Sequence, residues 1–85
     1  MGRGLWPTTA IMNSRMPLRI LLNGEPRDLD GPLTVSTLLA KLGIDARLVA
    51  VEVNRRVIRR AQHEATDVPD GAEVEIVSFV GGGRA

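Results

Sequence analysis

The sequence contains no cysteine, and this absence removes several kinds of chemistry at once. Without a thiol, the chain can form no disulfide, no thiolate metal site and no cysteine nucleophile. Aromatic residues are nearly as scarce, because Trp6 and Phe79 are the only two. A surface that binds nucleic acid by base stacking would need more of them. The lack of cysteine also fits a reducing cytoplasm.

Long apolar runs and a strong charge of either sign are missing too. The longest apolar run is only a few residues, too short for a transmembrane helix. Near the N-terminus, Pro7 interrupts the one candidate for the apolar part of a secretory signal. A net charge of +1 is too small for a dedicated polyanion binder. We therefore expect a cytoplasmic protein with no membrane and no nucleic-acid partner.

The length of 85 residues allows one domain, and 44% hydrophobic with 25% charged residues is typical of a globular chain. Residues 1–15 have no helix or strand period and are predicted to be a flexible N-terminal leader, in which Met12 or Met16 could be the true start. Residues 16–80 are predicted to fold, and residues 81–85 to be a flexible glycine tail.

The first half of the folded part predicts a hairpin and a helix. Alternating apolar residues at 18–22 indicate a half-buried strand, and Asn23-Gly24 is a strong turn signal. A short returning strand follows, kept at a sheet edge by Pro26. Thr34 is a good N-cap for a helix that ends at Gly43. Its apolar stripe consists of Val35, Leu38, Leu39 and Leu42.

The second half predicts three more strands, at 49–53, at 57–58 and at 73–79, with a loop and a helical turn at 61–67. The economical arrangement places the first and last long strands side by side in the middle of a mixed sheet, with the helix on one face. This is the α+β class, in the ubiquitin-like β-grasp arrangement of four to five strands and one main helix.

The last strand breaks the usual inward and outward alternation. Val77 and Phe79 fall on the solvent side, Ser78 points inward, and Leu21 on the neighbouring strand also points outward. Exposed apolar side chains on an uncovered sheet face indicate a partner-docking patch. Alternatively, a bulge shifts the register and buries Phe79 in the core.

Gly81, Gly82 and Gly83 follow directly on this strand. Glycines bury no side chain and are costly to order, so folding gains nothing from them. A frayed C-terminus with no function is the simple alternative explanation of these three glycines. Beside an exposed patch, however, a tail without side chains could be threaded, extended, into a narrow slot of another protein.

Several stretches together resemble the ThiS family, the bacterial sulfur carriers of thiamine biosynthesis, over residues 16–83. They are LRILLNGEP from Leu18, TVxxLL from Thr34, VAVEVN from Val49, the Asp70-Gly71 turn and EIVSFVGGG from Glu75. The small subunit of molybdopterin synthase shares the fold and the tail, so it is the alternative.

The resemblance implies how such a chain would act. An E1-like, ATP-dependent enzyme adenylates the C-terminal glycine, here Gly83 after Gly82, and a cysteine desulfurase or rhodanese-type donor supplies sulfur to form a thiocarboxylate. Thiazole synthase then takes the sulfur. The carrier binds no cofactor and is not itself an enzyme, because ATP and the catalytic groups belong to its partners. Since Arg84-Ala85 follow Gly83, a protease would have to remove them. Alternatively, the two residues are additions to the natural chain, or the chain is inactive as a sulfur donor.

The remaining polar groups support no catalytic or metal site. The basic cluster of Arg55, Arg56, Arg59 and Arg60 suits a solvated face or a contact with an acidic partner. His63 has no second histidine or cysteine to share a metal with. The glutamates 52, 64, 73 and 75 have the spacing of exposed residues and suggest no convergent acid pair. A ubiquitin-like interaction module that never carries sulfur stays open as the other functional class.

Overall fold

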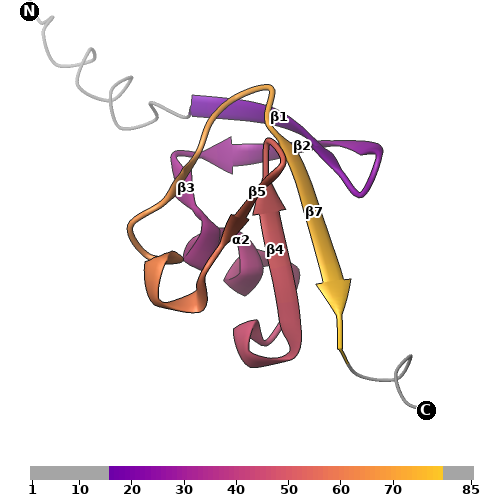
Figure 1. Ribbon diagram of the computed structural model, residues 1–85. Helices are drawn as coiled ribbons and strands as arrows, with labels where there is room; N and C mark the ends of the chain where they lie inside the picture. The colour runs from indigo at the N-terminus through magenta and orange to yellow at the C-terminus, as the bar shows by residue number, and fades with distance from the viewer. Residues whose placement is uncertain (1–15, 80–85) are drawn as a thin grey trace, which may run out of the picture.

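The computed structural model describes residues 16–79, which form a five-stranded mixed sheet and one α-helix behind it (Figure 1). The strands are β1 (Met16–Leu22), β2 (Glu25–Gly31), β4 (Val49–Val53), β5 (Arg56–Ile58) and β7 (Glu73–Ser78). They lie in the order β2-β1-β7-β4-β5, with β1 and β7 parallel and the other neighbours antiparallel. The predicted β-grasp arrangement is therefore confirmed. The predicted leader, residues 1–15, and the tail lie outside the described residues.

The hairpin of β1 and β2 forms where the turn signal places it. Asn23 and Gly24 have φ angles of 51° and 86°, the left-handed values that a tight two-residue turn requires. Pro26 lies in β2 at the edge of the sheet, where its missing N–H leaves no gap in a ladder. Because a turn of two residues sets the register, Leu22 pairs with Glu25.

The helix α2 (Val35–Leu42) has both of its predicted ends. Thr34 and Thr37 form a reciprocal cap, in which the Thr37 N–H donates to Thr34 Oγ1 at 3.1 Å and the Thr34 N–H donates to Thr37 Oγ1 at 2.8 Å. Gly43 ends the helix at a φ of 71°. A helix of eight residues is unstable alone in water, so its stability has to come from packing on the sheet.

The cap leads to a stability prediction. Thr34→Ala removes the hydroxyl that accepts a hydrogen bond from the Thr37 N–H. The free energy of unfolding should therefore fall by about 1 kcal/mol. In a domain of this size, that change lowers the melting temperature by about 4–8 °C. Lys41→Ala, on the exposed side of the same helix, is the control and should melt close to the parent. Equal melting temperatures for Thr34→Ala and the parent would contradict the cap.

The core lies between α2 and the sheet. Ile20 and Val74 come from the two central strands, and they are 1% and 0% exposed. The buried apolar residues are Leu18, Ile20, Leu22, Leu33, Val35, Leu38, Leu39, Val51, Val53, Val68, Ala72 and Val74. The buried residues alternate with exposed ones in β1 and β7 and with half-buried ones in β4, so only one face of the sheet is covered by the helix.

A second, two-stranded sheet joins β3 (Leu33–Thr34) to β6 (Asp67–Val68), and the sequence analysis did not predict it. Elements of two residues show no periodicity, which explains the omission. The chain before β6 contains the 3₁₀ helix η3 (Arg60–Gln62) and also serves the start of α2. Its carbonyls at His63 and Thr66 accept hydrogen bonds from the Ser36 and Val35 N–H groups, at 3.0 and 2.9 Å. A helix of two turns thus has its free N–H groups satisfied from a distant segment.

Asp45 caps a short 3₁₀ helix, η2 (Ala46–Leu48), that leads into β4. The Arg47 guanidinium donates to both carboxylate oxygens, at 3.1 and 2.7 Å, and the Arg47 N–H donates to Oδ1 at 2.9 Å. The side-chain bond to Arg47, followed by the backbone bond, lowers the pKa of Asp45 to about 2. Both interactions favour the ionised carboxylate.

This shift gives a pH dependence of stability with a definite sign. The folded pKa lies below the ordinary value of 3.8, so the stabilisation by Asp45 is present above about pH 4 and is lost as the pH falls toward about 2. Asp45→Asn keeps a capping oxygen but removes the charge. The melting temperatures of Asp45→Asn and the parent should differ near neutral pH and converge in acid. If the difference between the two melting temperatures stayed constant from pH 5 to about 2, the lowered pKa of Asp45 would not contribute to stability.

Candidate functional site

The last strand, β7, carries apolar side chains to the open face of the sheet. Val77 is 57% exposed and Phe79, just after the strand, is 61% exposed. The pairing with β4 is continuous from Val53 opposite Val74 to Val49 opposite Ser78. No residue is inserted in this register, so the alternative in which a bulge buries Phe79 is wrong.

Ser78 lies on the helix side, as predicted, yet it is exposed because α2 ends before covering it. A hollow of about 470 Å³ lies there, at the end of the helix. Its apolar lining includes Leu42, Ile44, Leu48 and Ile76. The end of β7 is therefore only partly covered on both of its faces.

Leu21 is also exposed, at 40%, but it does not lie beside Val77. Leu21 pairs with Glu73 across the parallel ladder, and Val77 is four residues further along β7. At about 3.3 Å per residue, roughly 13 Å separates the two positions along the strand. The three apolar residues predicted to dock a partner thus share one face without forming one contiguous patch. Val57 on β5, 69% exposed, is a further apolar residue that the sequence analysis missed.

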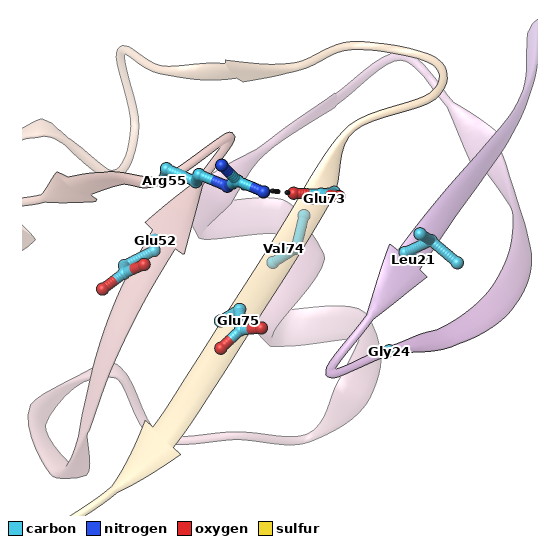
Figure 2. A pocket seen from close by; sticks show the side chains of 7 residues that line it. All are labelled: Leu21, Gly24, Glu52, Arg55, Glu73, Val74 and Glu75. Carbon is cyan, nitrogen blue, oxygen red and sulfur yellow. Dashed lines mark ion pairs between the residues drawn. The ribbon is translucent and has the colours of Figure 1, made fainter.

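Between Leu21 and β5, the open face is acidic (Figure 2). A hollow of about 340 Å³ is lined by Leu21, Gly24, Glu52, Arg55, Glu73, Val74 and Glu75. In the register of β4 and β7, Glu52 stands directly opposite Glu75. The two residues are thus neighbours across the ladder, although their carboxylates do not point toward each other (Figure 2). Strand alternation predicts on which face a residue lies, but not which residue it faces on the next strand.

Little in the fold compensates these carboxylates. Arg55 Nε lies 3.7 Å from Glu73 Oε1, and both side chains are at least half exposed (Figure 2). An ion pair so exposed contributes little to stability. Like charges opposite each other on neighbouring strands are destabilising. The Glu52–Glu75 pair therefore does not stabilise the isolated domain.

Two asparagines, in the turns that follow β1 and β4, hold β7 through their side chains. Asn54, at a φ of 52°, donates its N–H to the Glu73 carbonyl at 2.8 Å and accepts the Glu73 N–H on Oδ1 at 3.0 Å. Asn23 makes a similar pair of bonds to Ile76 further along the strand. The side-chain contacts span 19 and 53 residues, so no local signal in the sequence could reveal them.

The other polar groups are placed without forming a site. Arg55, Arg56, Arg59 and Arg60 are exposed, in agreement with a solvated basic face. His63 is buried, at 5% exposure, with Nε2 at 3.3 Å from the Ile58 carbonyl. Within residues 16–79, no group of three or more His, Cys, Asp or Glu side chains could hold a metal ion. No helix in that part of the chain is long and apolar enough to span a membrane.

The predicted sulfur-carrying residues, Gly82 and Gly83, and Gly81 before them, lie outside the described residues. The structure places the strand that precedes them. β7 is the central strand, and it is held by β1 on one side and by β4 on the other. A mixed sheet with this parallel central pair, one helix behind it and a glycine-rich continuation in the sequence defines a protein of the ubiquitin-like β-grasp class.

Comparisons with known proteins narrow this class. The ThiS family profile matches residues 20–83. A ThiS crystal structure from Geobacter metallireducens is 40% identical, with a TM-score of 0.68, and the match covers 78% of this chain and 100% of that one. The sulfur carrier protein ThiS of Thermus thermophilus is 34% identical over 75% of this chain and 98% of its own length. The chain belongs to the ThiS family, the sulfur carriers of thiamine biosynthesis.

Two further relatives are much longer proteins. The thiazole synthase of Paramagnetospirillum magneticum is 41% identical over 66 residues, and that of Magnetococcus marinus is 37% identical over 67. These segments make up 78% and 79% of this chain. The chain spans about a fifth of the length of either synthase.

Proposed function

We propose that this chain carries sulfur as a thiocarboxylate on Gly83 and donates it for thiazole formation. The observation that carries the proposal is the family match, which extends through the glycines and ends at Gly83. The fold supports it, because the central strand β7 leads directly into that segment of the sequence. Gly82 and Gly81 form the rest of the tail that would enter a partner's active site.

The proposed chemistry explains why partners are needed. A carboxylate is a poor acyl donor, because its leaving group would be oxide. An E1-like enzyme transfers AMP from ATP to the Gly83 carboxylate and releases pyrophosphate. A persulfide from a cysteine desulfurase or rhodanese-type donor then attacks the carbonyl, and AMP leaves. Reduction of the resulting acyl disulfide by a thiol frees the thiocarboxylate.

Thiazole synthase is the proposed acceptor. Two thiazole synthases contain a segment similar to this chain, which supports a working association between the two proteins. The carrier supplies the acyl terminus and a docking surface, and the enzymes supply the catalytic groups. We propose no cofactor bound to the carrier itself. Because the reacting carboxylate has to belong to glycine, Arg84-Ala85 must be removed by a protease before activation.

Intact mass spectrometry tests this function. The chain ending at Gly83 is incubated with ATP, the adenylating enzyme, the sulfur donor and a thiol. Its mass should rise by the difference between a sulfur and an oxygen atom. The full 85-residue chain should react only after losing its last two residues. A chain ending at Gly83 that never gains this mass, with a known ThiS reacting in parallel, would overturn the proposal and leave an interaction module that carries no sulfur.

The docking surface has a test with a matched control. Val77 and Val57 are both valines on the open face, with similar exposure, but only Val77 lies on the strand that leads to the tail. Val77→Ser should weaken binding to the adenylating enzyme by roughly tenfold, or about 1.4 kcal/mol, and Val57→Ser should not. Isothermal titration with each variant measures this difference. Equal affinities would remove Val77 from the docking surface, and the same comparison applies to Phe79 and Leu21.

A further inference from the structure

The carboxamide of Asn23 fills a position in the sheet that a backbone peptide would occupy if β1 were longer. The β1–β7 ladder pairs Leu21 with Glu73 and Leu22 with Val74. The chain then leaves the sheet in the Asn23-Gly24 turn. Two residues further along β7, Ile76 has no β1 backbone beside it. The Ile76 N–H instead donates to Asn23 Oδ1 at 2.8 Å, and Asn23 Nδ2 donates to the Ile76 carbonyl at 3.2 Å.

Asparagine is suited to this position for two separate reasons. Its φ of 51° is a left-handed value that asparagine tolerates better than most residues with a side chain. Its carboxamide also carries an acceptor and a donor, as a peptide group does, so it can pair with both polar groups of Ile76. Aspartate could accept but not donate, and glycine could do neither. The Asn23 N–H adds a third bond to β7, at 2.8 Å to the Val74 carbonyl.

The bonds are made directly before the part of β7 that would meet a partner. Val77 follows Ile76, Phe79 comes two residues later, and the glycines begin at 81. On the other side, β4 holds the same segment, with Ala50 opposite Val77 and the Phe79 N–H donating to the Leu48 carbonyl at 2.8 Å. Asn23 therefore restrains the β1 side of β7 where the docking residues begin.

We propose that Asn23 is a positioning residue, whose carboxamide holds the end of β7 so that Val77 and Phe79 are presented in one direction to the partner. It touches no reacting atom, and it acts through the backbone of Ile76. The inference rests on the proposed function, because it concerns how the tail is delivered to the activating enzyme. A misplacement of about 1 Å at a reacting group can cost a hundredfold in rate, so a restraint on the strand end has a measurable consequence.

Asn54 provides a control on the same strand. It has nearly the same φ, 52°, and it bonds β7 with its backbone N–H and its side-chain oxygen. Its partner, however, is Glu73 at the beginning of the strand, six residues before Phe79. Glycine at either position keeps the left-handed turn and removes the side-chain bonds. Asn23→Gly therefore removes side-chain hydrogen bonds near the end of β7, at Ile76, and Asn54→Gly removes one at its beginning, at Glu73.

The experiment compares local opening with activation. Amide hydrogen exchange is followed by NMR in the full chain, and kcat/KM for adenylation is measured in the chain ending at Gly83, at a temperature where all variants are folded. In Asn23→Gly, the Ile76 amide should exchange about tenfold faster, as expected for the loss of its hydrogen bond. Its kcat/KM should fall by about tenfold, and Asn54→Gly should keep nearly the parent value at a similar melting temperature. Asn23→Asp, which keeps only the acceptor, should protect Ile76 to an intermediate degree.

Two results would overturn the inference. One is a parent-like kcat/KM in Asn23→Gly although Ile76 exchanges faster. The other is an equal fall in both glycine variants, which would indicate a general loss of stability. Failure of the proposed function is distinct, because then the parent chain itself forms no adenylate with an enzyme that activates a known ThiS, and the positioning role fails with it.

Discussion

Gly83→Ala in the chain ending at residue 83 is expected to reduce thiocarboxylate formation by roughly a hundredfold or more. In the mechanism we propose, the added methyl group leaves a carboxylate of the same kind but has to fit beside the reacting carbonyl in the partner's active site, where small displacements are costly. Initial rates by intact mass spectrometry, at saturating ATP and sulfur donor, measure the effect. The melting temperature should not change, because the described core extends only from Leu18 to Val74.

Gly81→Ala is the graded control for this prediction. It adds the same methyl group two residues further from the reacting carbonyl, so the loss of rate should be smaller. If Gly83→Ala forms thiocarboxylate as fast as the parent, the terminal glycine has no special role and the carrier mechanism is wrong for this chain. Equal losses in the two variants would indicate that the tail needs flexibility along its length and not a bare final residue.

Leu38→Ala is expected to destabilise the fold by about 2–5 kcal/mol, the largest effect on stability among the changes considered. Leu38 is 0% exposed and lies at the centre of the apolar stripe that α2 presents to the sheet. Small domains are stable by only about 5–15 kcal/mol, so this loss is a large fraction of the total. Urea denaturation followed by circular dichroism should show a much lower midpoint.

Leu48→Ala is the matched control, because Leu48 is a leucine that is 43% exposed beside the hollow at the end of α2. Its removal should cost about 1 kcal/mol or less. A similar midpoint for Leu38→Ala and Leu48→Ala would mean that burial of the α2 stripe does not dominate stability. A change in the slope of the transition would instead point to an altered unfolded state.

Most elements of this fold could be predicted from the sequence because their signals are local. The alternation at Leu18, Ile20 and Leu22 predicts a strand with one buried face, and these three residues are buried. Thr34 and Gly43 mark the helix ends correctly, because a cap depends on residues within one turn. The two-residue strands β3 and β6 carry no such pattern, so their pairing depends on the packing of segments more than thirty residues apart.

In the candidate site, too, the features set by local pattern could be predicted, and those set by strand register could not. The strand period predicts exposure of Val77 and Phe79, and the structure confirms it over the alternative of a bulge. The distance of Leu21 from Val77 depends on the register of β1 against β7, which period does not specify. The hydrogen bonds of Asn23 to Ile76 join residues 53 apart, so no local pattern could predict them.

The sequence by itself determined which residues alternate, where the chain turns, where the helix begins and ends, and that glycines 81–83 follow the last strand. These are properties of near neighbours, set by backbone conformation and by which face of an element is apolar. Only the tertiary structure decided that Glu52 faces Glu75 and that Asn23 supports Ile76. Such pairs depend on how distant strands align, because β7 takes its place in the sheet through its contacts with β1 and β4.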